Sequence, residues 1–205
     1  MLSVSDLACA RGERLLFRGV NFSLPAGGLL HVQGPNGSGK TSLLRLLVGL
    51  ATPAHGVIRW RGRPIGELQH QYWREIHYLG HANGVKEELN AVENLTISSR
   101  LAGEPATGNR VESVLAQLEL TAHRHLPARY LSHGQKRRIA LARLLLSAKP
   151  LWVLDEPFAA LDASFLVLLR GVLEKHLVND GLAVLTTHQE VPIEAAARYT
   201  VRLDA

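Results

Sequence analysis

The chain has 205 residues, of which 46% are hydrophobic and 20% are charged, a balance that allows one domain with a buried core. A membrane helix needs ~18 or more uninterrupted apolar residues, and Arg143 and Lys149 interrupt the most apolar region, residues 139–154. The composition therefore excludes a chain that spans a membrane itself. Residues 1–6 lack the basic and apolar parts of a secretory signal, so we expect a cytosolic chain whose single cysteine, Cys9, packs as a thiol.

The net charge of +5 leaves three kinds of partner open: a nucleic acid, a membrane surface or a phosphate-rich ligand. The dense basic run at residues 136–138 starts a helical segment and has no interleaved aromatic residues that could stack on bases. We therefore expect this run to form a solvated helix face, and we expect no nucleic-acid partner.

Apolar and β-branched runs, separated by turn residues, predict the elements in chain order. Strands are expected at residues 3–8, 20–24, 29–33, 57–60 and 76–79, with a helix at 41–50. Helical periodicity dominates from residue 90 to about 147, opened by Asn90 and Glu93 at the spacing of a capping box. Alternation then resumes with strands at 151–154, 182–186 and about 199–203, and a helix at 162–178.

This order of elements predicts an α/β fold with two lobes in a single domain. A core lobe is built from both ends of the chain, about residues 1–85 and 150–205. A mostly helical subdomain, about residues 86–149, is inserted between them.

A glycine-rich loop follows the third predicted strand and precedes the first long helix, and it fits the pattern G-x-x-x-x-G-K-[ST]. Its residues are Gly34, Pro35, Asn36, Gly37, Ser38, Gly39, Lys40 and Thr41. Such a loop lets backbone N–H groups converge on phosphates, with Lys40 reaching the β- and γ-phosphates and Thr41 ligating Mg²⁺. The alternative is an incidental glycine-rich turn, which would not require a strand and a helix on its two sides.

Two acids, Asp155 and Glu156, end the apolar strand predicted at 151–154. Ligands of open α/β sheets bind at the carboxyl ends of strands. Asp155 is therefore a candidate Mg²⁺ ligand, and Glu156 a candidate general base for an attacking water. Taken alone, the alternative for this pair is two solvated acids at a strand end.

The segment Leu131-Ser132-His133-Gly134-Gln135, at the start of a predicted helix, narrows the class. It resembles the signature sequence L-S-G-G-Q of the ATP-binding-cassette (ABC) ATPases, and its place before Asp155 is also similar to theirs. The resemblance implies an ABC-type nucleotide-binding domain of the P-loop NTPase class, with a mixed sheet core, an antiparallel β portion and the helical subdomain. It also implies that Ser132, Gly134 and Gln135 contact ATP held by a second copy of the chain, hence a dimer. From the residue alone, Ser132 is a helix N-cap.

The remaining motifs of that family follow in order. Residues 160–162 resemble its D-loop, and His188, just after the strand predicted at 182–186, resembles its switch histidine at the γ-phosphate. His81 stands where the family has a glutamine that contacts Mg²⁺ and the lytic water. We expect His81 to replace part of those contacts, and the region from His81 to about Leu101 to face membrane subunits.

Arg11 occupies the place of the aromatic residue that stacks on adenine in the family. A guanidinium plane can stack on adenine by cation–π contact, and the alternative is a solvated arginine.

These departures together resemble one branch of the family, the haem-exporter ATPases of cytochrome c biogenesis. The segments that carry this resemblance are 80–81, 84–86, 91–95, 151–158 and 185–189. The resemblance implies an ATP- and Mg²⁺-dependent ATPase at the cytoplasmic face of a bacterial inner membrane. It also implies integral membrane subunits as partners and haem-pathway proteins as indirect ones. The alternatives are an exporter of another cargo and a soluble ABC ATPase acting on ribosomes or DNA, which usually has two cassettes or a coiled-coil insertion.

Overall fold

The computed structural model describes residues 1–189 and 191–204. The chain divides into two compact units. Unit 1 comprises Met1–Gly80, Lys149–Ala159 and Leu168–Ala205, and unit 2 comprises His81–Ala148 and Ala160–Val167.

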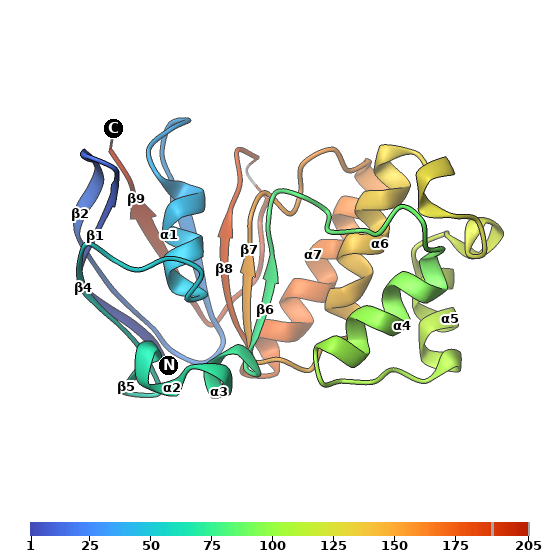
Figure 1. Ribbon diagram of the computed structural model, residues 1–205, viewed down its shortest axis with the longest axis horizontal. Helices are drawn as coiled ribbons and strands as arrows, with labels where there is room; N and C mark the ends of the chain where they lie inside the picture. The colour runs from blue at the N-terminus through green and yellow to red at the C-terminus, as the bar shows by residue number, and fades with distance from the viewer. Residues whose placement is uncertain (190, 205) are drawn as a thin grey trace. The chain divides into compact units, whose positions relative to one another are not determined.

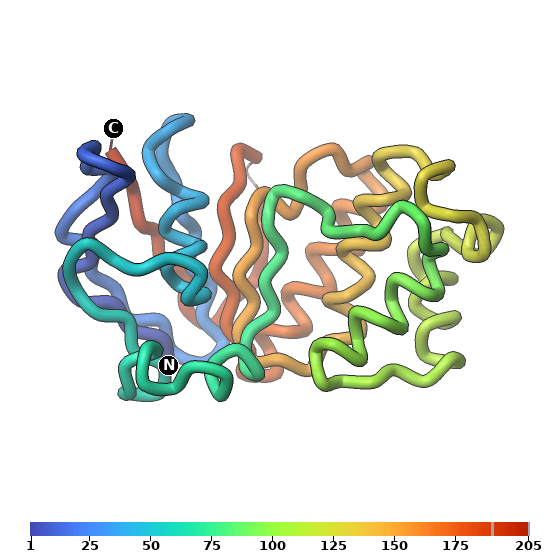
Figure 2. The backbone as a smooth tube through the Cα atoms, viewed as in Figure 1, coloured from blue at the N-terminus to red at the C-terminus, as the bar shows by residue number. Residues whose placement is uncertain are grey.

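Unit 1 contains a five-stranded parallel sheet that brings distant parts of the chain together (Figure 1). Its strand order is β6–β7–β8–β3–β9, and every pair is parallel. The strands are β3 (Gly28–Gln33), β6 (Ile76–Leu79), β7 (Leu151–Leu154), β8 (Leu182–Thr186) and β9 (Ala197–Arg202). Because β3 pairs with β9, the N-terminal and C-terminal parts of the chain run side by side here, as the tube in Figure 2 shows.

A second, antiparallel sheet of unit 1 has the order β2–β1–β4–β5. Its strands are β1 (Leu2–Arg11), β2 (Arg14–Leu24), β4 (His55–Trp60) and β5 (Arg63–Pro64). The β1–β2 pairing shifts register three times between Val4 and Ala10, which marks bulges or irregularities in the hairpin. Cys9 of β1 is buried and not in a disulfide, as expected.

The helix after the predicted phosphate-binding loop, α1 (Lys40–Leu47), buries four leucines in the hydrophobic core of unit 1. Two short helices, α2 (Ile65–Leu68) and α3 (His70–Trp73), follow β5. Tyr72 of α3 is almost fully buried, and its hydroxyl donates to the Leu47 carbonyl oxygen at 2.7 Å. This bond ties α3 to the end of α1.

Helix α7 (Ala163–Val178) carries His176, whose ring stacks on the ring of Trp152 in β7. The rings of His176 and Trp152 lie 3.8 Å apart at an interplanar angle of 7°, and His176 Nε2 lies 3.2 Å from the Leu182 carbonyl oxygen. A Cβ at residue 181 would lie 2.3 Å from the imidazole, so any other residue there would displace the stacked ring. Burial lowers the pKa of His176 below its usual value, since desolvation disfavours the imidazolium.

Acidification is therefore expected to destabilise the protein through His176. A histidine with a lowered pKa in the folded state stabilises the fold above the unfolded pKa, about 6.5, and this stability is lost as the pH falls below that value. We expect the Tm of the wild type to fall about 2–4 °C more between pH 7.5 and pH 5.5 than the Tm of His176→Phe. The phenyl ring keeps the stack on Trp152 but cannot be protonated, so parallel Tm profiles would contradict the prediction.

Unit 2 is mainly helical. It contains α4 (Ala91–Leu101), α5 (Gly108–Gln117) and α6 (His133–Leu146), with two 3₁₀ turns, η1 (Thr121–His123) and η2 (Ala128–Tyr130). The first residues of α7 also belong to this unit. Asn90 and Glu93 form the predicted capping box at the start of α4, with both reciprocal bonds at 2.9 Å.

The expectation that residues 136–138 form a solvated helix face was wrong. Arg137 is only 4% exposed, and its guanidinium donates to Asn83 Oδ1. Lys136 pairs with Glu87 at 2.6 Å, and Arg138 contacts two further acids of unit 2. The basic run is held inside its own unit because acidic and amide partners lie on neighbouring segments.

Most predicted elements were confirmed, and β6, β7 and β8 have the predicted bounds. The short elements β5, α2 and α3 were missed, since elements of two to four residues are too short to show a periodicity. Within residues 1–189 and 191–204, no helix is both long and apolar enough to span a membrane.

Candidate functional site

The phosphate-binding loop connects β3 to α1, and its glycines determine its shape. Gly34, Gly37 and Gly39 have φ angles of 151°, 84° and 98°, where other residues are strained. A Cβ on Gly34 would also lie 2.4 Å from the Leu203 carbonyl oxygen. Glycine is therefore needed for the curled backbone on which a phosphate cradle depends.

Two polar side chains of this loop are placed for a phosphate ligand. The Lys40 ammonium donates to the Gly34 and Pro35 carbonyl oxygens, at 2.8 and 3.2 Å, so it lies over the loop. Phosphate oxygens would be stronger, charged acceptors at the same place. The Ser38 hydroxyl is buried and has no hydrogen-bond partner among the described residues. Such a group is one that a bound ligand can satisfy.

The Asp155 carboxylate lies directly after β7 and receives a hydroxyl bond on each oxygen. Thr41 Oγ1 donates to Oδ2, and Thr186 Oγ1 donates to Oδ1, both at 2.8 Å. Asp155 is 3% exposed, and its backbone N–H donates to the Leu79 carbonyl oxygen of β6. The structure thus brings the two predicted metal ligands, Thr41 and Asp155, into direct contact.

Glu156 adopts a left-handed backbone conformation with φ of 49°. Its N–H donates to Thr186 Oγ1 at 2.9 Å. Its carboxylate accepts the backbone N–H of His188 at 3.3 Å, and His188 Nε2 lies 3.4 Å from the other carboxylate oxygen. The predicted general base and the predicted switch histidine therefore lie side by side.

Sequence analysis missed Thr186 as a member of this site. It is the last residue of β8 and 0% exposed. The sequence did contain a signal for this role, because Thr186 ends a strand that is otherwise fully apolar, and a buried hydroxyl needs a hydrogen-bond partner. Threonine is also an ordinary strand residue, so the sequence alone did not separate these two meanings.

The signature-like residues lie in unit 2, at the start of α6. Ser132 is the N-cap: its hydroxyl accepts the Gln135 N–H at 3.2 Å, and the Gln135 side chain accepts the Ser132 N–H at 2.9 Å. His133 begins the helix with a φ angle outside the left-handed region, so a side chain is tolerated where the signature has glycine. The N-cap role of Ser132 is confirmed, and contact with ATP stays a prediction.

A family model described as "ABC transporter" matches residues 17–159. The cytochrome c biogenesis ATP-binding export protein CcmA of Nitrosospira multiformis is 52% identical, over 97% of this chain and 96% of that protein. The chain belongs to the CcmA branch of the ABC transporter family. The CcmA protein of Pseudomonas aeruginosa is 49% identical over the full length of both chains.

Solved ABC structures share the fold. An ATP-binding subunit of an ABC transporter has a TM-score of 0.82 at 24% identity, covering 92% of this chain and 79% of that chain. The ATP-binding cassette MJ0796, solved as a dimer in a post-hydrolysis state with ADP and Pi, has a TM-score of 0.79 at 23% identity. It covers 92% of this chain and 88% of that one. The predicted α/β ABC-type fold is confirmed, and the chain is an ABC ATPase.

In this CcmA-type chain, the segment after His81 is hydrogen-bonded to α6 within unit 2. His81 itself is exposed. Arg143 donates to the Asn83 and Gly84 carbonyl oxygens, at 3.2 and 2.8 Å, and Arg137 donates to the Asn83 side chain. Both arginines come from α6, so the segment beginning at residue 83 is fixed to the helix that Ser132 caps.

Asp162, in the segment that resembles a D-loop, is also held by α6. Arg138 donates to Asp162 Oδ2 at 2.5 Å and to Glu119 Oε2 at 2.9 Å. Asp162 in turn accepts the Phe165 N–H and the Ser164 hydroxyl, at 2.9 and 2.7 Å. The Ser164, Phe165 and Arg138 bonds hold the pKa of Asp162 well below its usual range. These bonds connect residues 160–167 with the rest of unit 2.

Arg11, the predicted adenine contact, lies at the end of β1 in an exposed hairpin. The following strand is close to the phosphate-binding loop, since a Cβ on Gly39 would lie 3.0 Å from the Phe17 ring. Arg11 therefore belongs to a hairpin that packs near the loop, and its stacking on adenine stays a prediction.

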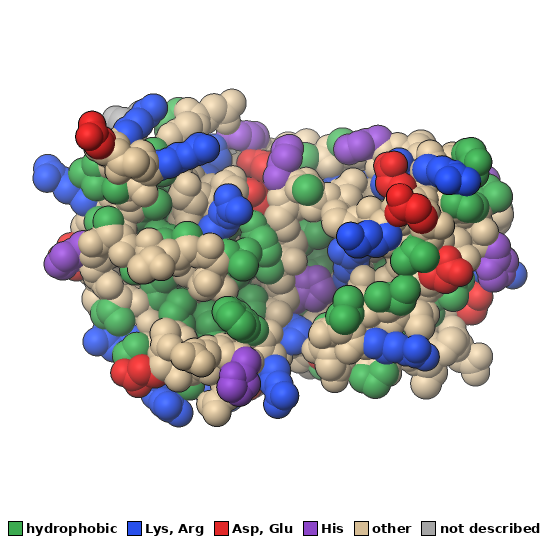
Figure 3. All heavy atoms as spheres, in the orientation of Figure 1, with side chains coloured by type: hydrophobic (Ala, Val, Ile, Leu, Met, Phe, Trp, Pro, Cys, Tyr) green, Lys and Arg blue, Asp and Glu red, His purple; other side chains and the backbone are tan. Residues whose placement is uncertain are grey.

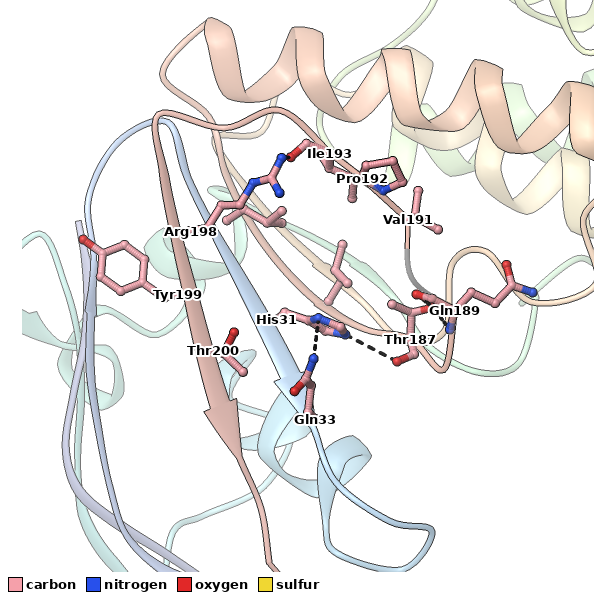
Figure 4. A pocket seen from close by; sticks show the side chains of 12 residues that line it. His31, Gln33, Thr187, Gln189, Val191, Pro192, Ile193, Arg198, Tyr199 and Thr200 are labelled. Atoms are coloured by element: carbon pink, nitrogen blue, oxygen red, sulfur yellow. Dashed lines mark hydrogen bonds between the residues drawn. The ribbon is translucent and has the colours of Figure 1, made fainter.

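Two hollows of unit 1 contain none of the predicted nucleotide-binding residues among the described residues that line them. One, of about 480 Å³, includes His31, which bonds to Gln33 and lies 3.3 Å from the Thr187 carbonyl oxygen (Figure 4). The other, of about 370 Å³, lies among α1, β4, α2 and α3, where hydrophobic side chains gather in Figure 3. Neither hollow is therefore part of the predicted ATP site.

Proposed function

We propose that this chain is the ATP-hydrolysing subunit of a membrane export complex for cytochrome c biogenesis, with haem as the cargo. The observation that carries the ATPase part is the grouping of Thr41, Asp155, Glu156 and His188 next to the phosphate-binding loop. The relatives named as cytochrome c biogenesis export proteins support the rest.

The residues fit Mg²⁺. Thr41 Oγ1 and the Asp155 carboxylate are hard oxygen ligands in direct contact, and Mg²⁺ sites in nucleotide-binding enzymes use one or two such groups with substrate phosphates. These two residues would hold the ion, which when bound offsets charge that develops on the transferring phosphate. Lys40 would bind the β- and γ-phosphates, and the loop from Gly34 to Gly39 would cradle them through backbone N–H groups.

Glu156 is proposed to accept the proton of the attacking water. The backbone N–H of His188 holds one carboxylate oxygen, so the base is already oriented. The His188 imidazole lies beside that carboxylate and can donate to the γ-phosphate as water attacks. His81 would contribute further contacts to Mg²⁺ or water.

The active form is proposed to be a dimer in which each signature serves the ATP of the other copy. Ser132 caps α6, so a phosphate there would meet a helix N-terminus together with Gly134 and Gln135. The dimeric MJ0796 structure supports this arrangement by analogy of fold. Arg11 is proposed to stack on the adenine.

The complex is proposed to lie at the cytoplasmic face of a bacterial inner membrane, with integral membrane subunits as partners and haem-pathway proteins as indirect ones. The chain would be a peripheral subunit that supplies ATP hydrolysis. Residues His81 to about Leu101 are the proposed contact region for those subunits.

The cargo and the partners can be tested by trapping the complex. A Glu156→Gln variant, which should bind ATP without hydrolysing it, would be purified from native membranes with Mg·ATP, beside Lys40→Ala as the untrapped control. Recovery of small polytopic membrane proteins with haem absorbance supports the proposal. Recovery of membrane subunits without any link to haem would keep the transport role but contradict haem as the cargo. Recovery of ribosomes or DNA instead of membrane subunits would overturn the transport role.

His81 gives a separate expected result in steady-state kinetics. Replacing His81 by alanine should lower ATP turnover about 10-fold, because one set of contacts to Mg²⁺ or water is lost. His81→Gln should retain turnover, since an amide can make similar bonds. His125→Ala, at another exposed histidine of unit 2, is the matched control. Equal turnover of wild type and His81→Ala would remove His81 from the site.

A further inference from the structure

Thr186 contacts both acids at the end of β7 through one hydroxyl. It is completely buried, and its Oγ1 lies 2.8 Å from Asp155 Oδ1 and 2.9 Å from the Glu156 backbone nitrogen. A threonine hydroxyl has one proton to donate and lone pairs to accept with. The Glu156 N–H occupies an acceptor position, so the single proton is committed to Asp155.

The bond from the Thr186 hydroxyl to Asp155 Oδ1 fixes the orientation of the Asp155 carboxylate. Thr41 already donates to Oδ2, so Thr186 on Oδ1 leaves both oxygens held from opposite elements, α1 and β8. Rotation of the carboxylate about its χ2 angle would break both bonds. The oxygen that Thr41 contacts is thereby kept facing the phosphate-binding loop.

The same hydroxyl holds the backbone of Glu156. At Asp155 the N–H still pairs with Leu79 of the neighbouring strand, but the chain then turns into a left-handed conformation at Glu156. Its N–H meets the Thr186 hydroxyl instead of a strand carbonyl. Two residues further along, His188 holds the carboxylate of Glu156. The end of β8 thus contacts Glu156 at its backbone and at its side chain.

We propose that Thr186 is a positioning residue for ATP hydrolysis, setting the orientation of the Mg²⁺-binding carboxylate and of the catalytic base through one shared hydroxyl. The proposal rests on the proposed roles of Asp155 and Glu156. It goes beyond them because Thr186 is assigned an effect on hydrolysis that acts through the two acids, to which its hydroxyl is bonded.

The test compares Thr186→Val, which keeps the branched shape and removes the hydroxyl, with Thr186→Ser, which keeps the hydroxyl. ATPase activity of the full chain in native membranes is measured against ATP and Mg²⁺ concentration, and ATP binding in EDTA is measured separately. We expect Thr186→Val to lower kcat about 10- to 100-fold and to raise the half-saturating Mg²⁺ concentration, as loss of an outer-shell partner does. Binding in EDTA should be unchanged, and serine should restore most of kcat.

Thr200→Val on β9 is the matched control, since it makes the same substitution on a strand of the same sheet away from both acids. If Thr186→Val does not fold, Thr186→Ala removes the hydroxyl without a larger side chain and takes its place. Wild-type kcat and Mg²⁺ dependence in the valine or alanine variant would overturn the proposal, as would a serine variant as impaired as valine. Glu156→Gln is run beside them: if it hydrolyses ATP normally, the proposed function itself fails, independently of Thr186.

Discussion

Replacing Glu156 by glutamine is expected to reduce ATP hydrolysis about 10²- to 10⁴-fold while leaving ATP binding close to wild type. The amide has nearly the same shape and can still accept the His188 N–H, which now holds the carboxylate at 3.3 Å. It cannot take a proton from water at neutral pH. Single-turnover hydrolysis of radiolabelled ATP measures the loss, and equilibrium binding of the same nucleotide measures the retained affinity.

Glu67→Gln is the control for this prediction, because Glu67 is an exposed residue of α2. It should leave both measurements unchanged. Substantial hydrolysis by Glu156→Gln would mean that another group accepts the proton. Loss of ATP binding in that variant would instead point to a disturbed site, which the circular dichroism spectrum and Tm would reveal.

Lys40→Ala is expected to differ from Glu156→Gln, because its main effect should be a loss of ATP affinity. A hydrogen bond to a charged group contributes about 1.5–3 kcal/mol, so removing the ammonium should weaken ATP binding by about 10- to 150-fold. Hydrolysis at cellular ATP concentrations would fall with it. Among the described residues, the hydrogen bonds of the Lys40 ammonium go to carbonyl oxygens of its own loop, so the fold should survive the substitution. Isothermal titration with ATP and thermal unfolding measure the two effects.

Lys175→Ala, at an exposed position of α7, removes a positive charge without touching the loop and serves as the control. A similar loss of affinity in both variants would assign the effect to net charge. Wild-type affinity in Lys40→Ala would contradict the phosphate role of the loop lysine.

The sequence predicted β6, β7 and β8 of the parallel sheet best, because each is a short and largely buried run, whereas β9 is mostly exposed and was placed about two residues late. It underestimated β2, which begins at Arg14, since residues 14–19 are exposed for the most part and lack a buried stripe. It overextended α1 by three residues, to Leu50, where Gly49 has a φ of 73° and ends the helix. Hydrophobic patterns in the sequence therefore predict buried segments well but predict the ends of helices poorly.

The residues of the candidate site were predictable where they lie directly after a strand or within the glycine-rich loop. The contacts of Asp155 with Thr41 and of Glu156 with His188 join residues more than thirty positions apart, yet order along the chain placed all four at one sheet edge. The partners of residues 136–138 were not predictable, because Asn83, Glu87 and Glu119 meet α6 only through the packing of unit 2. Helical periodicity does not report which segment pairs with a basic side chain.

The left-handed backbone of Glu156 has a consequence for engineering this protein. A non-glycine residue at a φ of 49° raises the free energy of the folded chain by about 1 kcal/mol or more. Glycine at this position would relieve that strain and raise the melting temperature, while removing the proposed base. A selection for heat resistance alone would therefore favour inactive chains at residue 156, so any thermostable library must be screened for ATP turnover at the same time.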